Sequence, residues 1–403
     1  MQTAPVAACV AACAFTLVTT PAVLVSMRRL AAIDEVTPRS SHQAPTARGG
    51  GVAIVLGLFV GVLTAVLTHG HGGPNLLPLT AAAALFGLIG LAEDVGGVRA
   101  MRRLALQTAA SFVVTVLAVL AAVLGEPTPG IAAVLVVTVC APLWITGFVN
   151  VFNFMDGING ISGVSAALSG ATLAVLGAVR DAAAVSAGGI LVAAVALGFL
   201  PYNFPRARVF LGDVGSYTFG AVVAVLTAQA VLAGVPIEAA LAPSALYLAD
   251  TSATLVRRVR AGEPWHTAHR SHAYQRLTIA GWSHARVTGL VAGTSGLVVA
   301  LSLASFGPPP GRLGADAVAG LALAGYLALP RWVAGHPADG HQADRQPSAG
   351  RAGAGQPGAG LPTSSATPTL PAQRTAPPGT PARAAPPPAA APPSVRPPGQ
   401  EAS

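Results

Sequence analysis

Apolar segments about as long as a lipid bilayer is thick recur along this sequence and limit its fold more than any other feature. One of them, "VLVVTVCAPLWITGFV", has no charged residue, and only 9% of the chain is charged, against roughly 25% in soluble domains. About 20 apolar residues cross a bilayer as a helix. A helix is required because lipid offers the backbone no hydrogen-bond partners. The sequence therefore predicts an all-α polytopic membrane protein.

The segments and the loop charges together predict a topology. Eleven segments are long enough, so we expect about 10–11 transmembrane helices: 5–26, 50–68, 76–92, 104–124, 130–149, 160–179, 183–200, 217–234, 238–256, 286–306 and 314–332. With the N-terminus outside, fifteen arginines fall in cytoplasmic loops and two, Arg180 and Arg312, in outer loops. Arginine-rich loops stay in the cytoplasm. We therefore expect a plasma-membrane protein whose N-terminus faces outside and whose C-terminus faces the cytoplasm.

Two domains follow from the change in composition. Residues 1–333 form the membrane-embedded domain, and residues 334–403 form a Pro/Ala/Gly-rich tail that we expect to be disordered and cytoplasmic. The net charge of +8 is explained by topology-setting arginines, so nucleic acid is not an expected partner. Cys9, Cys13 and Cys140 lie in apolar segments without metal or disulfide spacing.

Polar residues gather at the predicted cytoplasmic ends of the helices, where ionisable groups usually have a function. The adjacent Glu93 and Asp94 suit a divalent cation or a proton, or form an ordinary acid pair neutralised by nearby arginines. The stretch "NVFNFMDGINGISG" repeats polar residues every three positions, either as a ligand-binding wall or as interhelical glue. Its polar residues are Asn150, Asn153, Asp156 and Asn159.

Two further clusters follow later in the chain. Asp213, in "VFLGDVGSYTFG", suits Mg²⁺ or a helix N-cap equally well. The segment "PWHTAHRSHAYQRL" offers cationic donors for phosphate oxygens. Alternatives for this segment are a plain basic loop or, with weak spacing, a zinc site. Acids for a divalent metal and arginines for phosphates, together at a membrane boundary, fit phosphoryl transfer between a soluble nucleotide and a lipid.

Five motifs in order carry a family resemblance over residues 5–332. They are "ARGGGVAI" at 47–54, "GLAEDVGG" at 90–97, "NVFNFMDGINGISG" at 150–163, "VFLGDVGSYTFG" at 209–220 and "HRSHAYQRL" at 269–277. Together they resemble the polyprenyl-phosphate N-acetylhexosamine-1-phosphate transferases of glycosyltransferase family 4, closest to members that start surface polysaccharides. The resemblance implies that a polyprenyl phosphate attacks the β-phosphate of a UDP-N-acetylhexosamine at a cytoplasmic-face active site. UMP leaves, and Mg²⁺, with Mn²⁺ as a substitute, neutralises the donor.

The resemblance also implies roles for individual residues. Asp213 is the expected principal metal ligand and Asn153 the second. The expected substrate-binding residues are Arg48, Arg103, Asn150, Asn159 and Phe210, with Phe210 on uracil, Asn159 at the uracil edge and Arg103 at the phosphates. The expected catalytic residues are Glu93, Asp94, Asp156, His269, Arg270 and His272. The expected partners are the UDP-sugar, polyprenyl phosphate and the bilayer; a homodimer, the sugar and the polyprenyl length stay open.

Two positions depart from the family pattern. Glu93 replaces the first Asp of a usual pair, which makes Asp94 the safer candidate, and Asn159 replaces the last acid of a usual "DGxDG". An Asn amide still offers a donor and an acceptor to uracil. A phosphate monoester has a second pKa near ~6 and hardly needs a base, so we expect Glu93 and Asp94 to act mainly through positioning.

Two other function classes fit a chain this apolar. A transporter would place its polar residues near the bilayer midplane, whereas these lie at one face. An intramembrane prenyltransferase usually shows Asp-rich DxxxD-type repeats, which this sequence lacks.

Overall fold

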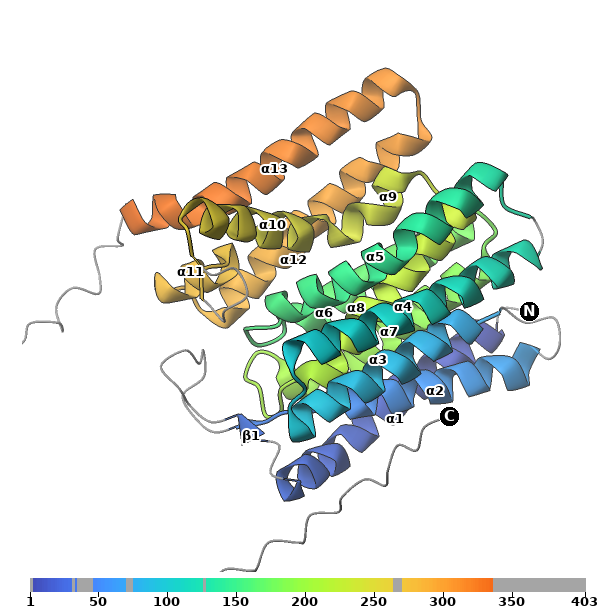
Figure 1. Ribbon diagram of the computed structural model, residues 1–403, viewed down its shortest axis with the longest axis horizontal. Coiled ribbons are helices and arrows are strands. Elements are labelled where there is room, and N and C mark those ends of the chain that lie inside the picture. The colour runs from blue at the N-terminus through green and yellow to red at the C-terminus, as the bar shows by residue number, and fades with distance from the viewer. Residues whose placement is uncertain are drawn as a thin grey trace, which may run out of the picture. The chain divides into compact units, whose positions relative to one another are not determined.

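The computed structural model describes residues 3–30, 33–34, 46–69, 75–125, 128–263 and 270–335, all within one compact unit, Met1–Asp339. The elements are α1 (Thr3–Arg29), β1 (Ile33–Asp34), β2 (Thr46–Ala47), α2 (Gly51–His69), α3 (Leu77–Gly96), α4 (Ala100–Val123), α5 (Ile131–Met155), α6 (Ile161–Val179), α7 (Ala183–Asn203), α8 (Gly212–Leu232), α9 (Ile237–Leu241), η2 (Ala242–Ser244), α10 (Ala245–Arg260), α11 (Ala273–Ile279), α12 (His284–Ser302), η3 (Leu303–Phe306) and α13 (Pro309–Gly335) (Figure 1). Within these ranges ten helices are long and apolar enough to cross a membrane. The prediction of an all-α polytopic membrane protein is confirmed.

The predicted span 238–256 does not form one helix, which corrects the count of eleven to ten. The chain there breaks into α9, the 3₁₀ turn η2 and α10. Pro243 lies in the break. A proline interrupts a helix because it cannot donate the backbone hydrogen bond that continues it. α9 contacts η3 at the end of α12, and the Ala273 N–H of α11, just before α12, donates to Asp250 of α10. The broken segment therefore still leads from one end of α12 to the other.

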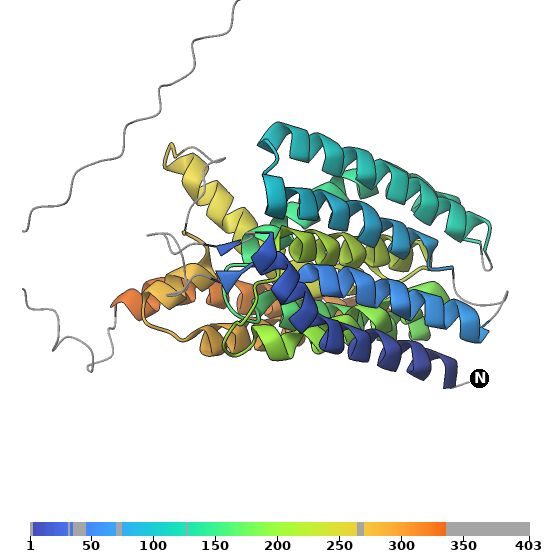
Figure 2. The same ribbon diagram turned by 90° about the horizontal axis from the view of Figure 1, so that it is seen from below.

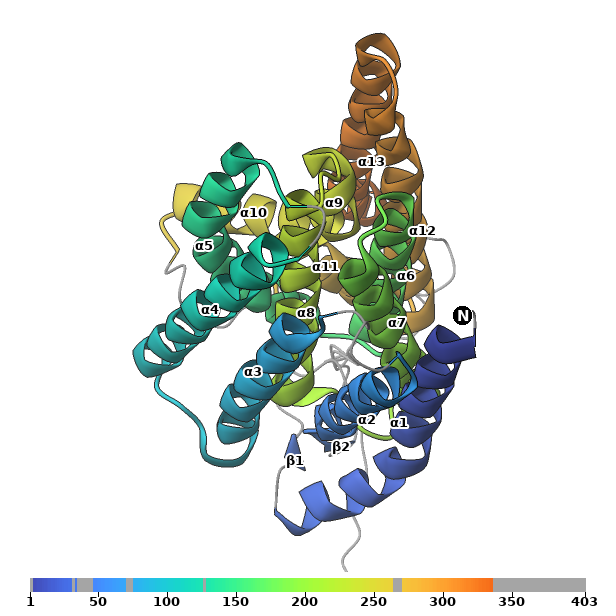
Figure 3. The same cartoon turned by 90° about the vertical axis from the view of Figure 1, so that its right-hand side faces the viewer.

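Helix α8 occupies the centre of the bundle. It contacts α2, α3, α4, α5, α6 and α7, and these helices surround it in the view of Figure 3. In the apolar stretch of α8, 94% of the residues are buried, against 11% in that of α13. The approach of α2 to α8 needs glycine, because a Cβ on Gly51 would lie 2.2 Å from the Gly215 Cα. The N-terminus of α8, with Asp213, is thus held tightly among its neighbours.

Alternate connections between the helices meet at one end of the bundle. β1 pairs antiparallel with β2, with Ile33 opposite Ala47, and this pair and α11 lie at the same end (Figures 1 and 2). Hydrogen bonds join the connections: the Gly50 N–H donates to the Phe210 carbonyl at 3.0 Å, and the Gly160 N–H to Asn203 Oδ1 at 2.8 Å. The predicted polar clusters thus share one end, while the side of the membrane that this end faces stays a prediction.

The predicted tail falls almost wholly outside the described residues. Only residues 334 and 335 of the range 334–403 are described, and they end α13. Its disorder and the domain boundary stay predictions.

Candidate active site

Asn153 and Asp213, the two predicted metal ligands, are in direct contact although 60 residues separate them. Asn153, in the last turn of α5, donates from Nδ2 to Asp213 Oδ1 at 2.6 Å and to Ser216 Oγ at 3.0 Å. Asp213 lies in the first turn of α8, whose N-cap position is Leu211 and shows no side-chain cap. The N-cap alternative for Asp213 is therefore wrong, and its carboxylate faces a partner on another helix.

Asp94 takes the capping role at α8 from the neighbouring helix α3. Its Oδ1 accepts from the Asp213 N–H and its Oδ2 from the Val214 N–H, both at 3.0 Å. The first N–H groups of a helix have no partner within the helix and attract negative charge, so this carboxylate satisfies two of them. Its side chain is 1% exposed, and Arg48 Nε lies 3.9 Å from Oδ1. Asp94 is thus placed to position Asp213.

Glu93, the other acid of the pair, closes the turn between α3 and α4. Its Oε2 accepts from the Val98 N–H at 2.8 Å, and its Oε1 pairs with Arg103 Nη1 at 3.1 Å. This pairing fits the arginine-neutralised alternative for Glu93. Arg103 is also near enough to interact electrostatically with Asp213, and its phosphate-facing role stays a prediction.

Asp156, in the loop between α5 and α6, adds a third acid near Asp213 and Asp94. Burial raises the pKa of Asp156 to about 7, the Ser162 hydroxyl opposes the shift, and the charges of Asp213 and Asp94 add to it. The three carboxylates thus create a region of negative potential that disfavours further negative charge. A divalent cation would relieve this repulsion.

The donor set suits Mg²⁺ better than zinc. Mg²⁺ is usually held by one or two carboxylates plus substrate phosphates and keeps several waters, so Asp213 with the neighbouring Asn153 is a fitting set. Within the described residues no group of three or more His, Cys, Asp or Glu could hold a metal. His266 and His269 lie outside the described ranges.

We predict that Asp156→Ala lowers turnover about 10- to 100-fold, the loss typical when a group supporting a metal site is removed. The loop should still fold, because backbone and Tyr274 contacts hold it. The Tyr274 hydroxyl donates to the Phe154 carbonyl at 3.0 Å. Turnover of purified variants measures the effect, with Asp316→Ala, at an exposed acid on α13, as the control. A fully active Asp156→Ala protein would leave this loop with a packing role only.

Asn150 is engaged with α4. Its Nδ2 donates to Gln107 Oε1 of α4 and to the Thr146 carbonyl, both at 2.8 Å. Gln107 is buried, so this contact is the interhelical link that the alternative interpretation predicted. No contact in the described chain joins Asn150 to Asp213, and its substrate-binding role stays a prediction.

Asn159 and Phe210, the predicted uracil contacts, lie in neighbouring loops. Asn159 donates from Nδ2 to the Pro205 carbonyl at 3.2 Å, and its backbone N–H donates to His284 Nδ1 at 3.3 Å. The Phe210 N–H donates to the Ala47 carbonyl at 2.9 Å. Asn203, which the sequence analysis missed, bridges the two loops through the Gly160 N–H and the Val209 carbonyl. An amide directly before "FPR" at the end of an apolar span was its only signal.

The basic motif is only partly described, because His269 lies outside the described residues. Arg270 is close enough to His284 to interact with it electrostatically, and His284 contacts Asn159, so Arg270 lies near the predicted nucleotide loops. His272 is 3% exposed, and its Nδ1 lies 3.4 Å from Asp250 Oδ1. His272 is thus buried against Asp250, and its predicted catalytic role stays a prediction.

Asp250 is the main residue that the sequence analysis missed. It is fully buried on α10 and accepts from the Ala273 N–H at 2.9 Å, the Tyr274 N–H at 3.4 Å and the Tyr326 hydroxyl at 2.8 Å. An acid inside the apolar segment "ALYLADTSATLV" was the available signal, because such acids are rare and usually functional.

We predict that Asp250→Ala destabilises the protein by about 3–5 kcal/mol, the cost of leaving buried partners of a charged group unpaired. The α11 N-terminus should loosen first, because Asp250 holds the Ala273 and Tyr274 N–H groups. Thermal unfolding measures the first effect and amide hydrogen exchange over 272–276 the second. Asp316→Ala, at an exposed acid on α13, is the control. Unchanged exchange in Asp250→Ala would refute the anchoring role.

Similarity to known proteins supports the family resemblance of these motifs. The family model "Glycosyl transferase family 4" matches residues 76–231, a range that runs from the start of α3 into the last turn of α8. A decaprenyl-phosphate N-acetylglucosaminephosphotransferase of Mycobacterium tuberculosis is 31% identical over 73% of this chain and 82% of its own length. The protein of the same name from Mycobacterium leprae is 31% identical over 65% of this chain and 74% of its own length. A probable undecaprenyl-phosphate N-acetylglucosaminyl 1-phosphate transferase of Bacillus subtilis is 25% identical over 71% and 80%. The chain therefore belongs to the polyprenyl-phosphate N-acetylhexosamine-1-phosphate transferases of glycosyl transferase family 4.

Proposed function

We propose that this protein transfers a HexNAc-1-phosphate, GlcNAc-1-phosphate by default, from a UDP-sugar to decaprenyl or undecaprenyl phosphate and releases UMP. The observation that carries the proposal is the contact of Asn153 with Asp213 beside two further acids and Arg103. The relatives whose names describe transfer of N-acetylglucosamine phosphate to a polyprenyl phosphate support the substrate classes.

In the proposed reaction an oxygen of the acceptor phosphate attacks the donor's β-phosphorus. The bond from that phosphorus to the bridging oxygen breaks, and the bridging oxygen leaves with its electron pair on UMP. Asp213 and Asn153 would hold Mg²⁺, which supplies charge neutralisation of the donor pyrophosphate when bound. Arg103 would contact phosphate oxygens, and Asn159 would present its amide to the uracil edge.

Asp94 contributes to this reaction by position. Its two carboxylate oxygens accept backbone N–H groups of α8, which fixes the first turn that carries Asp213. Because the acceptor phosphate is largely dianionic at neutral pH, the reaction has little need of a base. The product would be a polyprenyl pyrophosphoryl sugar that starts a cell-envelope glycan, made at the cytoplasmic face.

Release of UMP tests the proposal. Purified protein, decaprenyl phosphate, Mg²⁺ and UDP-GlcNAc should yield UMP, and omission of the lipid acceptor or of Mg²⁺ should stop its release. Other UDP-N-acetylhexosamines define the donor. No UMP with any donor of this class would count against the proposal, and accumulation of substrate inside proteoliposomes would favour the transporter alternative.

A further inference from the structure

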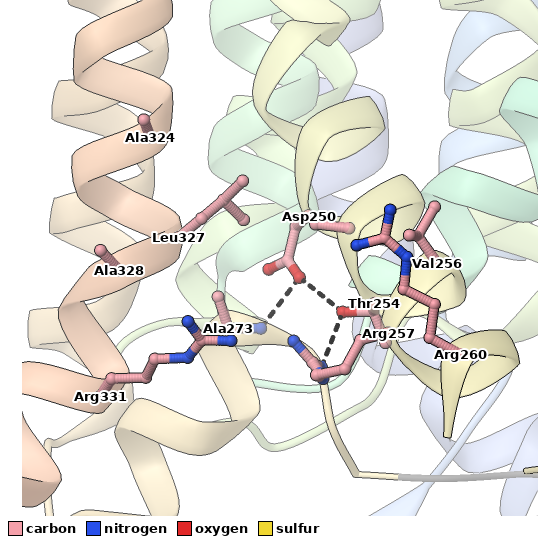
Figure 4. A pocket seen from close by; sticks show the side chains of 11 residues that line it. Asp250, Thr254, Val256, Arg257, Arg260, Ala273, Ala324, Leu327, Ala328 and Arg331 are labelled. Carbon is pink, nitrogen blue, oxygen red and sulfur yellow. Dashed lines mark hydrogen bonds between the residues drawn. The ribbon is translucent and has the colours of Figure 1, made fainter. Parts of the chain in front are cut away.

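A cavity with several arginines in its wall lies between α10, α11 and α13, and neither Asn153 nor Asp213 lines it. Its volume is about 570 Å³, and its lining includes Asp250, Arg257, Arg260 and Arg331. Figure 4 shows Arg331 reaching from α13 and Arg257 from α10 toward one another, with Arg260 beside Val256 on α10. The motifs that resemble the family leave these three arginines unassigned.

The cavity carries an excess of positive charge. Its one lining acid, Asp250, accepts the Ala273 and Tyr274 N–H groups and the Tyr326 hydroxyl. Across the described ranges of the chain, no acid pairs with Arg260 or Arg331. Three arginines thus face one acid whose oxygens already accept several hydrogen bonds.

Arg257 keeps donors for a ligand. Its Nη2 donates to Thr254 Oγ1 at 3.3 Å and to the Ser271 carbonyl. Both bonds therefore come from the same one of the three guanidinium nitrogens, which together carry five N–H donors. Burial first, and then the charge of Arg276, lower the pKa of the Arg257 guanidinium. Arg331 adds to this repulsion, whereas Asp250 and Glu263 oppose it. An anion in the cavity would relieve the repulsion among the arginines.

The remainder of the wall is apolar and belongs partly to a candidate membrane span. Ala324, Leu327 and Ala328 come from α13, which is long and apolar enough to cross the bilayer. Arg257 and Arg260 lie in the last turn of α10, and Arg331 lies close to the end of α13. This arrangement matches the chemistry of a phospholipid: the arginines at the helix ends would bind its phosphate at the membrane interface, and the apolar residues of α13 would contact its acyl chains.

We propose that the cavity lined by Arg257, Arg260 and Arg331 binds the phosphate headgroup of an anionic membrane lipid, at a site separate from the Asn153–Asp213 pair. The buried residues Asp250, His272 and Tyr274 connect this cavity to the predicted active-site loops. A phosphate bound to Arg257 would keep its guanidinium hydrogen-bonded to the Ser271 carbonyl. This bond would restrict the backbone motion of the described part of the basic motif. The proposal concerns binding alone, so it stands or falls independently of the transferase assignment.

Binding of fluorescent phosphatidylglycerol to the purified full-length protein in detergent micelles tests this site. The double variant R260Q/R331Q removes two exposed arginines, and R28Q/R29Q, at the end of α1, removes two exposed arginines elsewhere. Loss of charge-assisted hydrogen bonds should raise the apparent Kd of phosphatidylglycerol at least about tenfold in R260Q/R331Q. R28Q/R29Q should bind like the unchanged protein, and phosphatidylcholine should compete poorly.

Three results would overturn the proposal. Equal binding of phosphatidylcholine would remove the preference for an anionic headgroup. Equal weakening in both double variants would indicate general surface charge. Inorganic phosphate that displaces the lipid at the lipid's own concentration, with the same dependence on Arg260 and Arg331, would identify a site for soluble phosphate instead. Melting curves of both variants confirm that they are folded.

Discussion

Replacing Asp213 by Asn is expected to lower turnover at least about 100-fold while leaving the bundle folded. The substitution removes the carboxylate charge that we assign to the metal, and loss of one electrostatic contact to a transition state commonly costs 100- to 1000-fold. The fold should survive, because Asp94 binds the backbone N–H of residue 213, not its side chain. The amide can also keep a hydrogen bond to Asn153.

UMP release at saturating substrates measures the Asp213→Asn effect, repeated over a range of Mg²⁺ concentrations. The matched control is Asp316→Asn, which removes one exposed carboxylate from α13 and should retain full activity. Turnover within a factor of two of the unchanged protein, at low and high Mg²⁺ alike, would rule out Asp213 as the principal metal ligand.

Replacing Asp94 by Ala should damage both stability and turnover, unlike the change at Asp213. The buried Val214 N–H and the partly buried Asp213 N–H at the start of α8 lose their acceptors, and a buried donor left without a partner costs about 1–3 kcal/mol. The first turn of α8 should loosen, and Asp213 with it. Thermal melting and hydrogen exchange at 213–216 measure the structural effect, and UMP release measures the functional one. Arg48→Gln, which leaves both cap bonds intact, should cost much less stability.

The milder Asp94→Asn separates a positioning role from a base role. An amide presents one oxygen in place of two, so one of the two cap bonds is lost at every pH. The loss of turnover should therefore persist from neutral to high pH. Full recovery of turnover at high pH would instead show that Asp94 removes a proton, and would contradict the positioning account.

The position of the polar clusters at one end of the bundle could be predicted by counting the membrane spans between them. Connections that alternate along an apolar bundle fall at the same end, so residues 93–94, 150–159, 209–216 and 270–277 had to share one end. The Asn153–Asp213 contact fits their predicted joint role as metal ligands. The sequence could not show that Asn150 binds Gln107. Amides spaced three residues apart lie on one side of a helix, but the spacing does not identify the neighbouring helix that they contact.

The role of Asp94 depends on packing between helices that no local pattern encodes. A Cβ on Gly90 would lie 2.4 Å from the Asp213 carbonyl oxygen, so α3 reaches the start of α8 only because position 90 is glycine. The Asp250 network was missed for a different reason. The apolar length of residues 238–256 predicted a single span. Pro243 instead breaks the segment, and Asp250 of α10 accepts a hydrogen bond from the first residue of α11.

Transfer of the donor's β-phosphorus to lipid is the most direct test of the central claim. UDP-GlcNAc labelled with ³²P at the β-phosphate, incubated with the protein, Mg²⁺ and decaprenyl phosphate, should place the label in the lipid fraction. The uridine should leave as unlabelled UMP, and Asp213→Asn should transfer almost no label. Label recovered in released UDP, with an unlabelled sugar on the lipid, would show transfer of the sugar alone and would contradict the proposed reaction.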